Sequence, residues 1–126
     1  MTEHAVAVSD AAKTFNPGKS IEVHALVDIY LHIEPGEFVT LLGPSGCGKS
    51  TLLRLIASLT EPTSGTVEVY GKSDEQGRRD QDYGMAFQRA GLFDWRTVAK
   101  NIELPLELMG WNRSDRETRA KEMLDL

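Results

Sequence analysis

The sequence has few of the features that mark membrane-spanning, disulfide-rich or nucleic-acid-binding proteins. Its 126 residues contain one cysteine, Cys47, so no disulfide can form within the chain, and this usage fits the cytosol. No uncharged apolar run approaches the roughly 20 residues that a membrane-spanning helix needs, and the first residues lack the basic start of a secretory signal. The formal net charge of -5 provides no basic surface for nucleic-acid backbones. We therefore expect no nucleic-acid partner and no membrane insertion by the chain itself.

One segment carries a motif with a clear physical purpose. Gly43 to Ser50 reads Gly-Pro-Ser-Gly-Cys-Gly-Lys-Ser and matches the phosphate-binding pattern G-x-x-x-x-G-K-S/T. It follows the apolar run Phe38–Leu42, which predicts a buried strand, and precedes leucines at helical spacing, which predict a helix. A glycine-rich turn that opens a helix directs backbone N–H groups at an anion. The segment therefore predicts a nucleoside triphosphate site.

Each residue type in this loop predicts a separate contact. The glycines let backbone N–H groups converge on phosphate oxygens. Lys49 is expected to reach the β and γ phosphates, Ser50 to bind Mg²⁺, and Thr51 to contact the α phosphate. Cys47 is expected to be a small loop residue rather than a nucleophile. The predicted nucleotide-binding residues of the loop are Gly43, Pro44, Ser45, Gly46, Cys47, Gly48, Lys49, Ser50 and Thr51.

The chain around the loop alternates between strand and helix patterns. An apolar start, a turn at residues 16–19 and an alternating run at residues 27–33 predict an antiparallel hairpin. Thr66–Tyr70 and Tyr83–Phe87 predict further strands, and the polar stretch Lys72–Asp82 predicts a surface loop. The residues expected on the buried face of the hairpin are Val27, Ile29, Leu31 and Ile33.

The C-terminal part of the chain has a helical pattern. It begins at Thr97, and Pro105 predicts a kink or an end. Ser114, with Glu117 three residues later, predicts the capping-box start of a last helix. Apolar residues of that helix continue to Leu126, so we expect the chain to be truncated. The apolar face of the first of these helices is expected to consist of Val98, Ile102, Leu106 and Met109.

The order of these segments resembles that of ATP-binding cassette (ABC) transporter ATPases. The stretch Phe87–Val98 further resembles the nitrate, sulfonate and taurine importer branch, although that branch usually has a proline where this chain has Asp94. Members of the family are about twice as long, so the resemblance covers only the N-terminal half of an ATP-binding domain. The residues that carry the resemblance are Phe15, Pro35-Gly36-Glu37, the loop Gly43 to Thr51, Glu61-Pro62-Thr63-Ser64-Gly65 and Phe87-Gln88.

The resemblance implies an α/β fold of the P-loop NTPase type in three parts. These are an antiparallel β unit at residues 1–36, a partial RecA-like core at residues 37–96 and the start of a helical subdomain at residues 97–126. Together they would form the N-terminal part of one ATP-binding domain.

The resemblance also implies roles for particular residues. Phe15 would stack on adenine, and Gln88 would reach the Mg²⁺ and the attacking water. Lys49 and Gln88 are then the expected catalytic residues, and Ser50 and Gln88 the expected metal ligands. Simpler alternatives stay open at this point: Phe15 as an aromatic that packs on the core, and Gln88 as a polar residue at a strand end.

The implied function is that of the ATP-binding subunit of an ABC importer, which couples MgATP hydrolysis to solute import. Its implied partners are a transmembrane permease subunit, contacted through Leu92–Arg96, and a second ATP-binding subunit in a homodimer. These partners would place it in the cytoplasm, on the inner face of the plasma membrane. The family's signature, Walker B and switch-histidine segments are absent from these 126 residues, so this chain alone is expected to bind ATP without hydrolysing it.

Other classes of protein use similar loops. A nucleoside monophosphate kinase of the guanylate kinase type can also have Gly-Pro-Ser-Gly-x-Gly-Lys, but its loop normally opens the domain. Here an antiparallel unit precedes the loop, and the Gln88 segment follows it. A GTPase would need an Asn-Lys-x-Asp segment, which this sequence lacks. The remaining alternative is a non-catalytic nucleotide-binding module.

Overall fold

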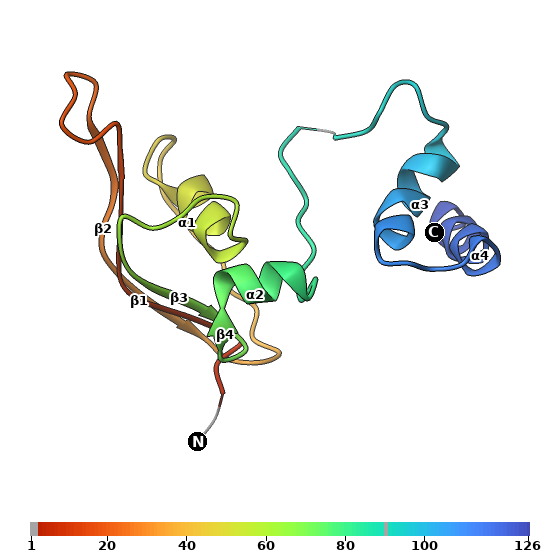
Figure 1. Cartoon of the computed structure of the whole chain (residues 1–126), viewed down its shortest axis with the longest axis horizontal. Helices are drawn as coiled ribbons and strands as arrows, with labels where there is room; N and C mark the ends of the chain where they lie inside the picture. Colours follow the sequence, from red (N-terminus) through yellow and green to blue (C-terminus); the bar gives the residue numbers. More distant parts are fainter. Residues whose placement is uncertain (1–2, 90) are drawn as a thin grey trace. The chain divides into compact units, whose positions relative to one another are not determined.

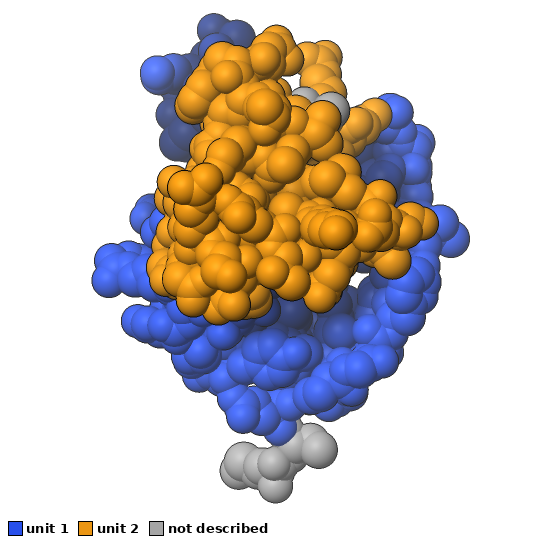
Figure 2. Space-filling model, turned by 90° about the vertical axis from the view of Figure 1, so that its right-hand side faces the viewer, with its two compact units in different colours: residues 1–84 blue, residues 85–126 orange. Residues whose placement is uncertain are grey.

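A computed structural model of the chain describes residues 3–89 and 91–126. These residues form two compact units, with the boundary between Gly84 and Met85. Figure 1 shows the helices and strands of each unit, and Figure 2 distinguishes the two units by colour. None of the described helices combines the length and the apolar composition that crossing a bilayer requires.

The first unit is built on a four-stranded antiparallel sheet with the order β2-β1-β3-β4 (Figure 1). Val6 lies opposite Ile33, and Phe15 lies opposite Val23. This pairing confirms the predicted hairpin, and β3 confirms the strand expected near Thr66. The strands are β1 (Val6–Phe15), β2 (Val23–Ile33), β3 (Ser64–Val69) and β4 (Lys72–Ser73).

Two aspartates interrupt the alternation of side chains along the hairpin. Asp10 of β1 and Asp28 of β2 have positive φ angles of 50° and 49°, and the pairing register shifts beside both. A bulge of this kind changes which residues face the core. Leu26 is therefore 6% exposed and Val27 57% exposed, so the expected burial of Val27 is wrong. The other expected residues lie beyond the bulge and are half-buried: Ile29, Leu31 and Ile33.

Helix α1 (Lys49–Ile56) supplies the apolar residues that cover the sheet. Leu52 and Leu55 lie about one turn apart on its buried face, whereas Leu53 is half-exposed. At the C-terminal end of α1, the phenol of Tyr83 donates a hydrogen bond to the carbonyl oxygen of Ala57 at 2.6 Å. The buried core residues of this unit include Val8, Ala11, Leu26, Leu52, Leu55 and Val67.

Two segments expected to be strands form no ladder. Among the described residues, Phe38–Leu42 and Tyr83–Phe87 pair with none of the strands β1–β4. Phe38 is 93% exposed, which contradicts its expected burial. An extended apolar segment becomes a buried strand only where other strands bond to its edges and other elements cover its faces. No described strand provides those bonds here.

The polar stretch Lys72–Asp82 is not the loop that its composition predicts. It contains β4 and the short helix α2 (Asp74–Arg79). The hydroxyl of Ser73 caps α2 by accepting a hydrogen bond from the backbone N–H of Gln76 at 3.2 Å. Acidic residues occupy the first turn of α2 and arginines the last, which suits the helix dipole. Caps and charges, rather than an apolar stripe, therefore define this helix.

The second unit contains a pair of packed helices, α3 (Val98–Leu108) and α4 (Arg113–Leu124). Thr97 caps α3, as its predicted start requires, and the helix continues through Pro105 rather than ending there. The buried residue of α3 is Glu103, whose carboxylate pairs with Lys100 Nζ at 3.1 Å. In the expected apolar face, half-buried Ile102 and Leu106 lie between exposed Val98 and Met109.

Helix α4 begins two residues earlier than its sequence predicts. Asn112, not Ser114, is the cap, because its Oδ1 accepts a hydrogen bond from the backbone N–H of Asp115 at 2.9 Å. Asparagine and serine are comparably good caps. The capping-box pattern at Ser114 therefore competed with an equivalent residue two positions before it, and the prediction of Ser114 as the cap was wrong.

The packing of α1 can be tested with two leucines of the same helix. Leu55 is 0% exposed and Leu53 is 47% exposed. Leu55→Ala leaves a cavity in the core, so we expect a loss of about 2–5 kcal/mol in the free energy of unfolding, measured by urea titration. Leu53→Ala is expected to cost about 1 kcal/mol or less. Equal losses for the two variants would contradict this placement of α1.

Candidate functional site

The residues from Gly43 to Thr51 form a tight turn that runs directly into α1. The backbone N–H of Cys47 donates to the carbonyl oxygen of Pro44 at 3.3 Å and closes the turn. Gly46 and Gly48 have φ angles of 80° and 99°, in a region that glycine adopts without strain. The sequence therefore folds this segment into a curled loop at a helix N-terminus, as its motif predicts.

The backbone of Gly48 lies against strand β2. A Cβ atom at this position would lie 2.8 Å from the carbonyl oxygen of Ala25 and 2.9 Å from Leu26 Cδ2. Leu26 is a core residue, and both residues belong to the paired region of β2, so neither can move away easily. Only glycine fits here, and the contact fixes the loop to the sheet.

The side chain of Lys49 folds back into the loop. Its Nζ donates a hydrogen bond to the carbonyl oxygen of Pro44 at 3.0 Å and another to that of Gly43, and lies 3.4 Å from Cys47 Sγ. These partners are uncharged, and the loop itself contains no acidic residue. The loop therefore keeps a positive charge that no carboxylate within it neutralises.

The N-terminus of α1 is more open than those of the other helices that the structure describes. Its first turn has no acidic residue and no side-chain cap. Its first intrahelical bond runs from the backbone N–H of Leu52 to the carbonyl oxygen of Gly48, at 2.9 Å. The preceding N–H groups lack helical partners, so they and the helix dipole favour an anion. The other helices are capped by the side chains of Ser73, Thr97 and Asn112.

The hydroxyl residues that follow Lys49 lie in the first turn of α1. Ser50 is exposed and Thr51 half-buried. A hydroxyl oxygen beside bound phosphates is the type of ligand that Mg²⁺ accepts. The donor set of the loop therefore fits a polyphosphate and its metal ion.

Phe15 lies at the same end of the hairpin as the loop. It is the last residue of β1 and pairs with Val23, which is two residues from Ala25, the residue against which Gly48 packs. Two residues span about 7 Å of strand. The ring of Phe15 is 38% exposed, so part of it is accessible.

Lys13 belongs to this end of the hairpin, and sequence reasoning missed it. Its Nζ lies 5.2 Å from the centroid of the Phe15 ring and donates a hydrogen bond to the carbonyl oxygen of Glu61 at 2.6 Å. The sequence contained a signal for this contact, because Lys13 and Phe15 are two residues apart on one strand and such residues point to the same face. Lys13 therefore lies against the ring of Phe15 and links β1 by a hydrogen bond to the segment that follows α1.

The remaining site candidate is Gln88. It belongs to the second unit and lies in an exposed stretch without helix or strand. The first unit therefore assembles Phe15 and the loop, and Gln88 remains a candidate on the basis of its resemblance alone.

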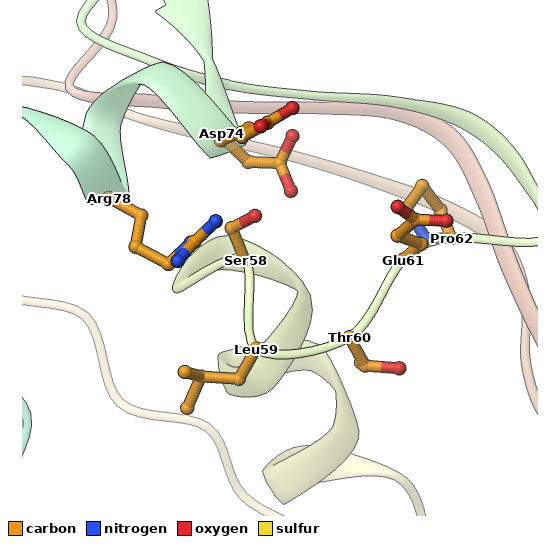
Figure 3. Close-up of a pocket in the computed structure, with 8 residues that line it drawn as sticks. Ser58, Leu59, Thr60, Glu61, Pro62, Asp74 and Arg78 are labelled. Carbon is orange, nitrogen blue, oxygen red and sulfur yellow. The ribbon is translucent and has the colours of Figure 1, made fainter.

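A pocket near the opposite end of α1 has a different character. In Figure 3 the carboxylates of Asp74 and Glu61 and the guanidinium of Arg78 border it. It adjoins the C-terminal end of α1, whereas the phosphate loop lies at the N-terminal end. This pocket is therefore separate from the loop. Its lining residues are Ser58, Leu59, Thr60, Glu61, Pro62, Asp74, Glu75 and Arg78.

Comparison with known proteins identifies one family. The model of the family described as ABC transporter matches residues 26–126. The nitrate import ATP-binding protein NrtD of Synechocystis sp. is 46% identical over 119 residues, which cover 94% of this chain and 44% of that protein. The methionine import ATP-binding protein MetN of Corynebacterium efficiens is 42% identical, over 90% of this chain and 33% of that protein. This chain thus spans less than half the length of these relatives.

Solved structures agree with the family assignment. A dimeric post-hydrolysis state of the ATP-binding cassette MJ0796, bound to ADP and Pi, superposes with a TM-score of 0.83 at 33% identity. The match covers 95% of this chain and 56% of that chain. The fold is therefore that of an ABC ATPase cassette.

The close contact between the loop and β2 can be tested with two glycines of the loop. Gly48→Ala places a Cβ against a strand, and we expect it to lower the free energy of unfolding by about 2–4 kcal/mol. Gly46→Ala has a similar positive φ but no atom within 4 Å of the added Cβ, so about 1 kcal/mol is expected from backbone strain alone. Thermal or urea unfolding measures both. Equal destabilisation would contradict the close approach of Gly48 to β2.

Proposed function

Because the chain belongs to the ABC transporter family, we propose that it binds MgATP at the loop Gly43–Thr51 and is the ATP-binding part of an importer subunit. The single observation that carries the proposal is the position of Lys49. Its ammonium lies inside a loop without carboxylates, next to an uncapped helix N-terminus. A triphosphate satisfies both the ammonium and the free N–H groups.

Each residue of the site has a proposed task. Lys49 leaves the carbonyl oxygens of Gly43 and Pro44 and pairs with the β and γ phosphates. The backbone N–H groups at the start of α1 donate to phosphate oxygens. Ser50 holds the metal ion, which when bound neutralises charge on the β and γ oxygens. Phe15, with one side of its ring near Lys13, stacks on adenine.

The tasks of Ser50 and Thr51 follow from their place in α1. Both lie in its first turn, where hydroxyl groups reach a ligand held at the helix N-terminus. We assign the metal contact to Ser50 and the α phosphate to Thr51. Gln88 is proposed to complete the metal contact and to orient the attacking water, a role that rests on the family resemblance.

We propose a transmembrane permease subunit as the partner of the segment Leu92–Arg96. Leu92 and Phe93 are exposed, and Trp95 is 77% exposed. Apolar groups gathered on a surface in this way are typical of contact sites. Through this contact the protein would lie on the inner face of the plasma membrane.

A second ATP-binding subunit is the other proposed partner. The related cassette MJ0796 is dimeric in two solved structures. Dimerisation would bring further groups to each nucleotide and allow closure driven by ATP to reach the permease.

For the solute we propose a nitrate-type anion. The support is the 46% identity to the nitrate import protein of Synechocystis sp.. A methionine relative at 42% and a sulfate/thiosulfate relative of Gloeobacter violaceus at 40% identity are competitors, so uptake of labelled solutes by the assembled importer decides between them. The guanylate kinase alternative is set aside, because the family match and these relatives point to ABC proteins.

The nucleotide site can be tested with two lysines. We expect Lys49→Ala to weaken binding of MgATP at least tenfold, because a charge-assisted contact to the phosphates is lost; tenfold corresponds to about 1.4 kcal/mol. Lys19→Ala removes the same charge from an exposed turn of the same unit and should leave the affinity unchanged. Isothermal titration calorimetry measures both. Equal affinities for wild type and Lys49→Ala would contradict the proposed site.

Phosphate release distinguishes an ATPase from a binding module. When the chain is part of a complete ATP-binding subunit in the assembled importer, we expect steady release of phosphate from MgATP, and Lys49→Ala should abolish it. Binding without release would instead favour the non-catalytic module.

A further inference from the structure

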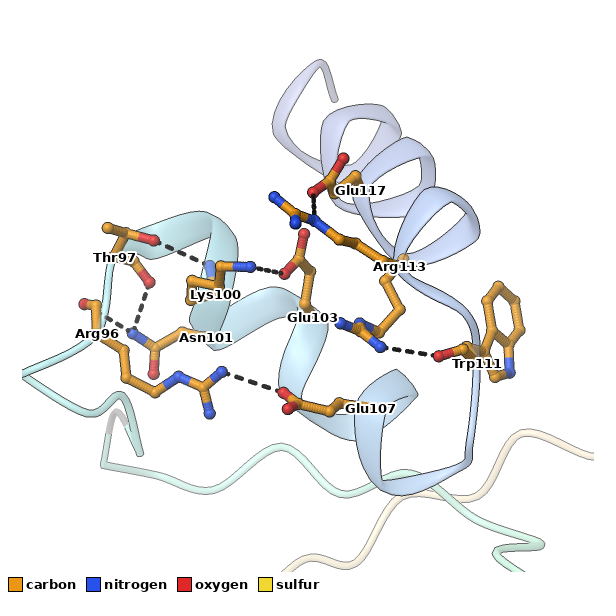
Figure 4. Close-up of polar contacts among 10 residues, drawn as sticks. Arg96, Thr97, Lys100, Asn101, Glu103, Glu107, Trp111, Arg113 and Glu117 are labelled. Carbon is orange, nitrogen blue, oxygen red and sulfur yellow. Dashed lines mark hydrogen bonds and ion pairs between the residues drawn. The ribbon is translucent and has the colours of Figure 1, made fainter.

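The side-chain amide of Asn101, on α3, is the hub of a group of hydrogen bonds to the chain just before that helix (Figure 4). Its Oδ1 accepts from the backbone N–H of Phe93 at 2.8 Å. Its Nδ2 lies 3.1 Å from the carbonyl oxygen of Phe93, 3.3 Å from that of Arg96 and 3.0 Å from that of Thr97. One amide therefore bonds both ends of the turn 93–97.

Neighbouring contacts brace the same turn. The backbone N–H of Arg96 donates to the carbonyl oxygen of Phe93 at 3.1 Å. The guanidinium of Arg96 pairs with Glu107 of α3 at 3.2 Å and lies 5.6 Å from the ring of Trp95. The rings of Phe93 and Trp95 lie 5.4 Å apart. The turn is thus held in one conformation although its aromatic side chains are exposed.

The chemistry of Asn101 suits this task better than that of other small residues. An asparagine side chain offers an acceptor and two donors at once, and all are used here. Aspartate would place a carboxylate against three carbonyl oxygens, and alanine would leave these backbone groups without the amide. A turn left loose would have to be ordered when a partner binds, and that ordering weakens association.

We propose that Asn101 is a positioning residue: it holds the turn 93–97 so that Phe93 and Trp95 meet the permease subunit in a preformed arrangement. This inference rests on the proposed function of the segment Leu92–Arg96 as the permease contact. It assigns to Asn101 an effect on the affinity of that contact, and none on nucleotide binding in the first unit.

The bracing itself is tested without a partner. In the full chain, Asn101→Ala should abolish the protection of the Phe93 amide against hydrogen exchange, measured by NMR. Asn112→Ala is the matched control, because it removes an asparagine that caps the other helix of the same unit and leaves the turn intact. Unchanged protection of Phe93 in Asn101→Ala would overturn the proposal.

The effect on the partner is tested with the permease subunits of the same importer in nanodiscs. We expect Asn101→Ala to raise the dissociation constant for the permease by about tenfold, measured by surface plasmon resonance, without changing the affinity for MgATP. Asn101→Asp keeps the size of the side chain but loses its donors, and should raise the same dissociation constant. Asn112→Ala should not.

Two results would overturn the inference in different ways. If the folded Asn101 variants lose Phe93 protection but bind the permease as tightly as wild type, the turn is braced without a role in docking, and only the proposal for Asn101 fails. If the permease does not bind wild-type protein at all, the proposed permease contact fails, and the presentation of the turn to a permease fails with it. The hydrogen-exchange result then still reports whether Asn101 braces the turn.

Discussion

The contact between the backbone of Gly48 and strand β2 is the constraint on which the rest of the site depends. It seats the phosphate loop on a paired strand, and the leucines of α1 then fill the core beneath the sheet. Because β2 pairs with β1, the same contact brings the loop to the end of the hairpin that carries Phe15. A helix N-terminus, an ammonium and an aromatic ring are therefore held by one small sheet.

The phosphate loop provides positive charge, and the core beneath the sheet provides the packing that stabilises α1. Leu52 and Leu55 stabilise α1, so its N-terminus can do without the capping side chain that α2, α3 and α4 each have. The open N–H groups and Lys49 then remain for an anion. In the second unit, by contrast, polar side chains bond to groups of the same unit. Asn101 bonds to its backbone, and Glu103 pairs with the ammonium of Lys100.

Much of this arrangement could be predicted from the sequence where the signal is local. The loop, the start of α1 and the start of α3 at Thr97 each depend on a few adjacent residues. Predictions failed where distant partners decide: the bulge at Asp28 exposed Val27, and Phe38–Leu42 lacks a described strand to pair with. The hydrogen bonds of Asn101 were not predicted, because side-chain bonds to a preceding turn leave no periodic pattern in the sequence.

The most direct test of the account is a crystal structure with Mg²⁺ and a non-hydrolysable ATP analogue. We expect phosphates at the backbone N–H groups that begin α1, with Lys49 Nζ moved from the carbonyl oxygens of Gly43 and Pro44 onto the β and γ phosphates. A nucleotide bound elsewhere, with Lys49 still bonded to those two carbonyls, would contradict it.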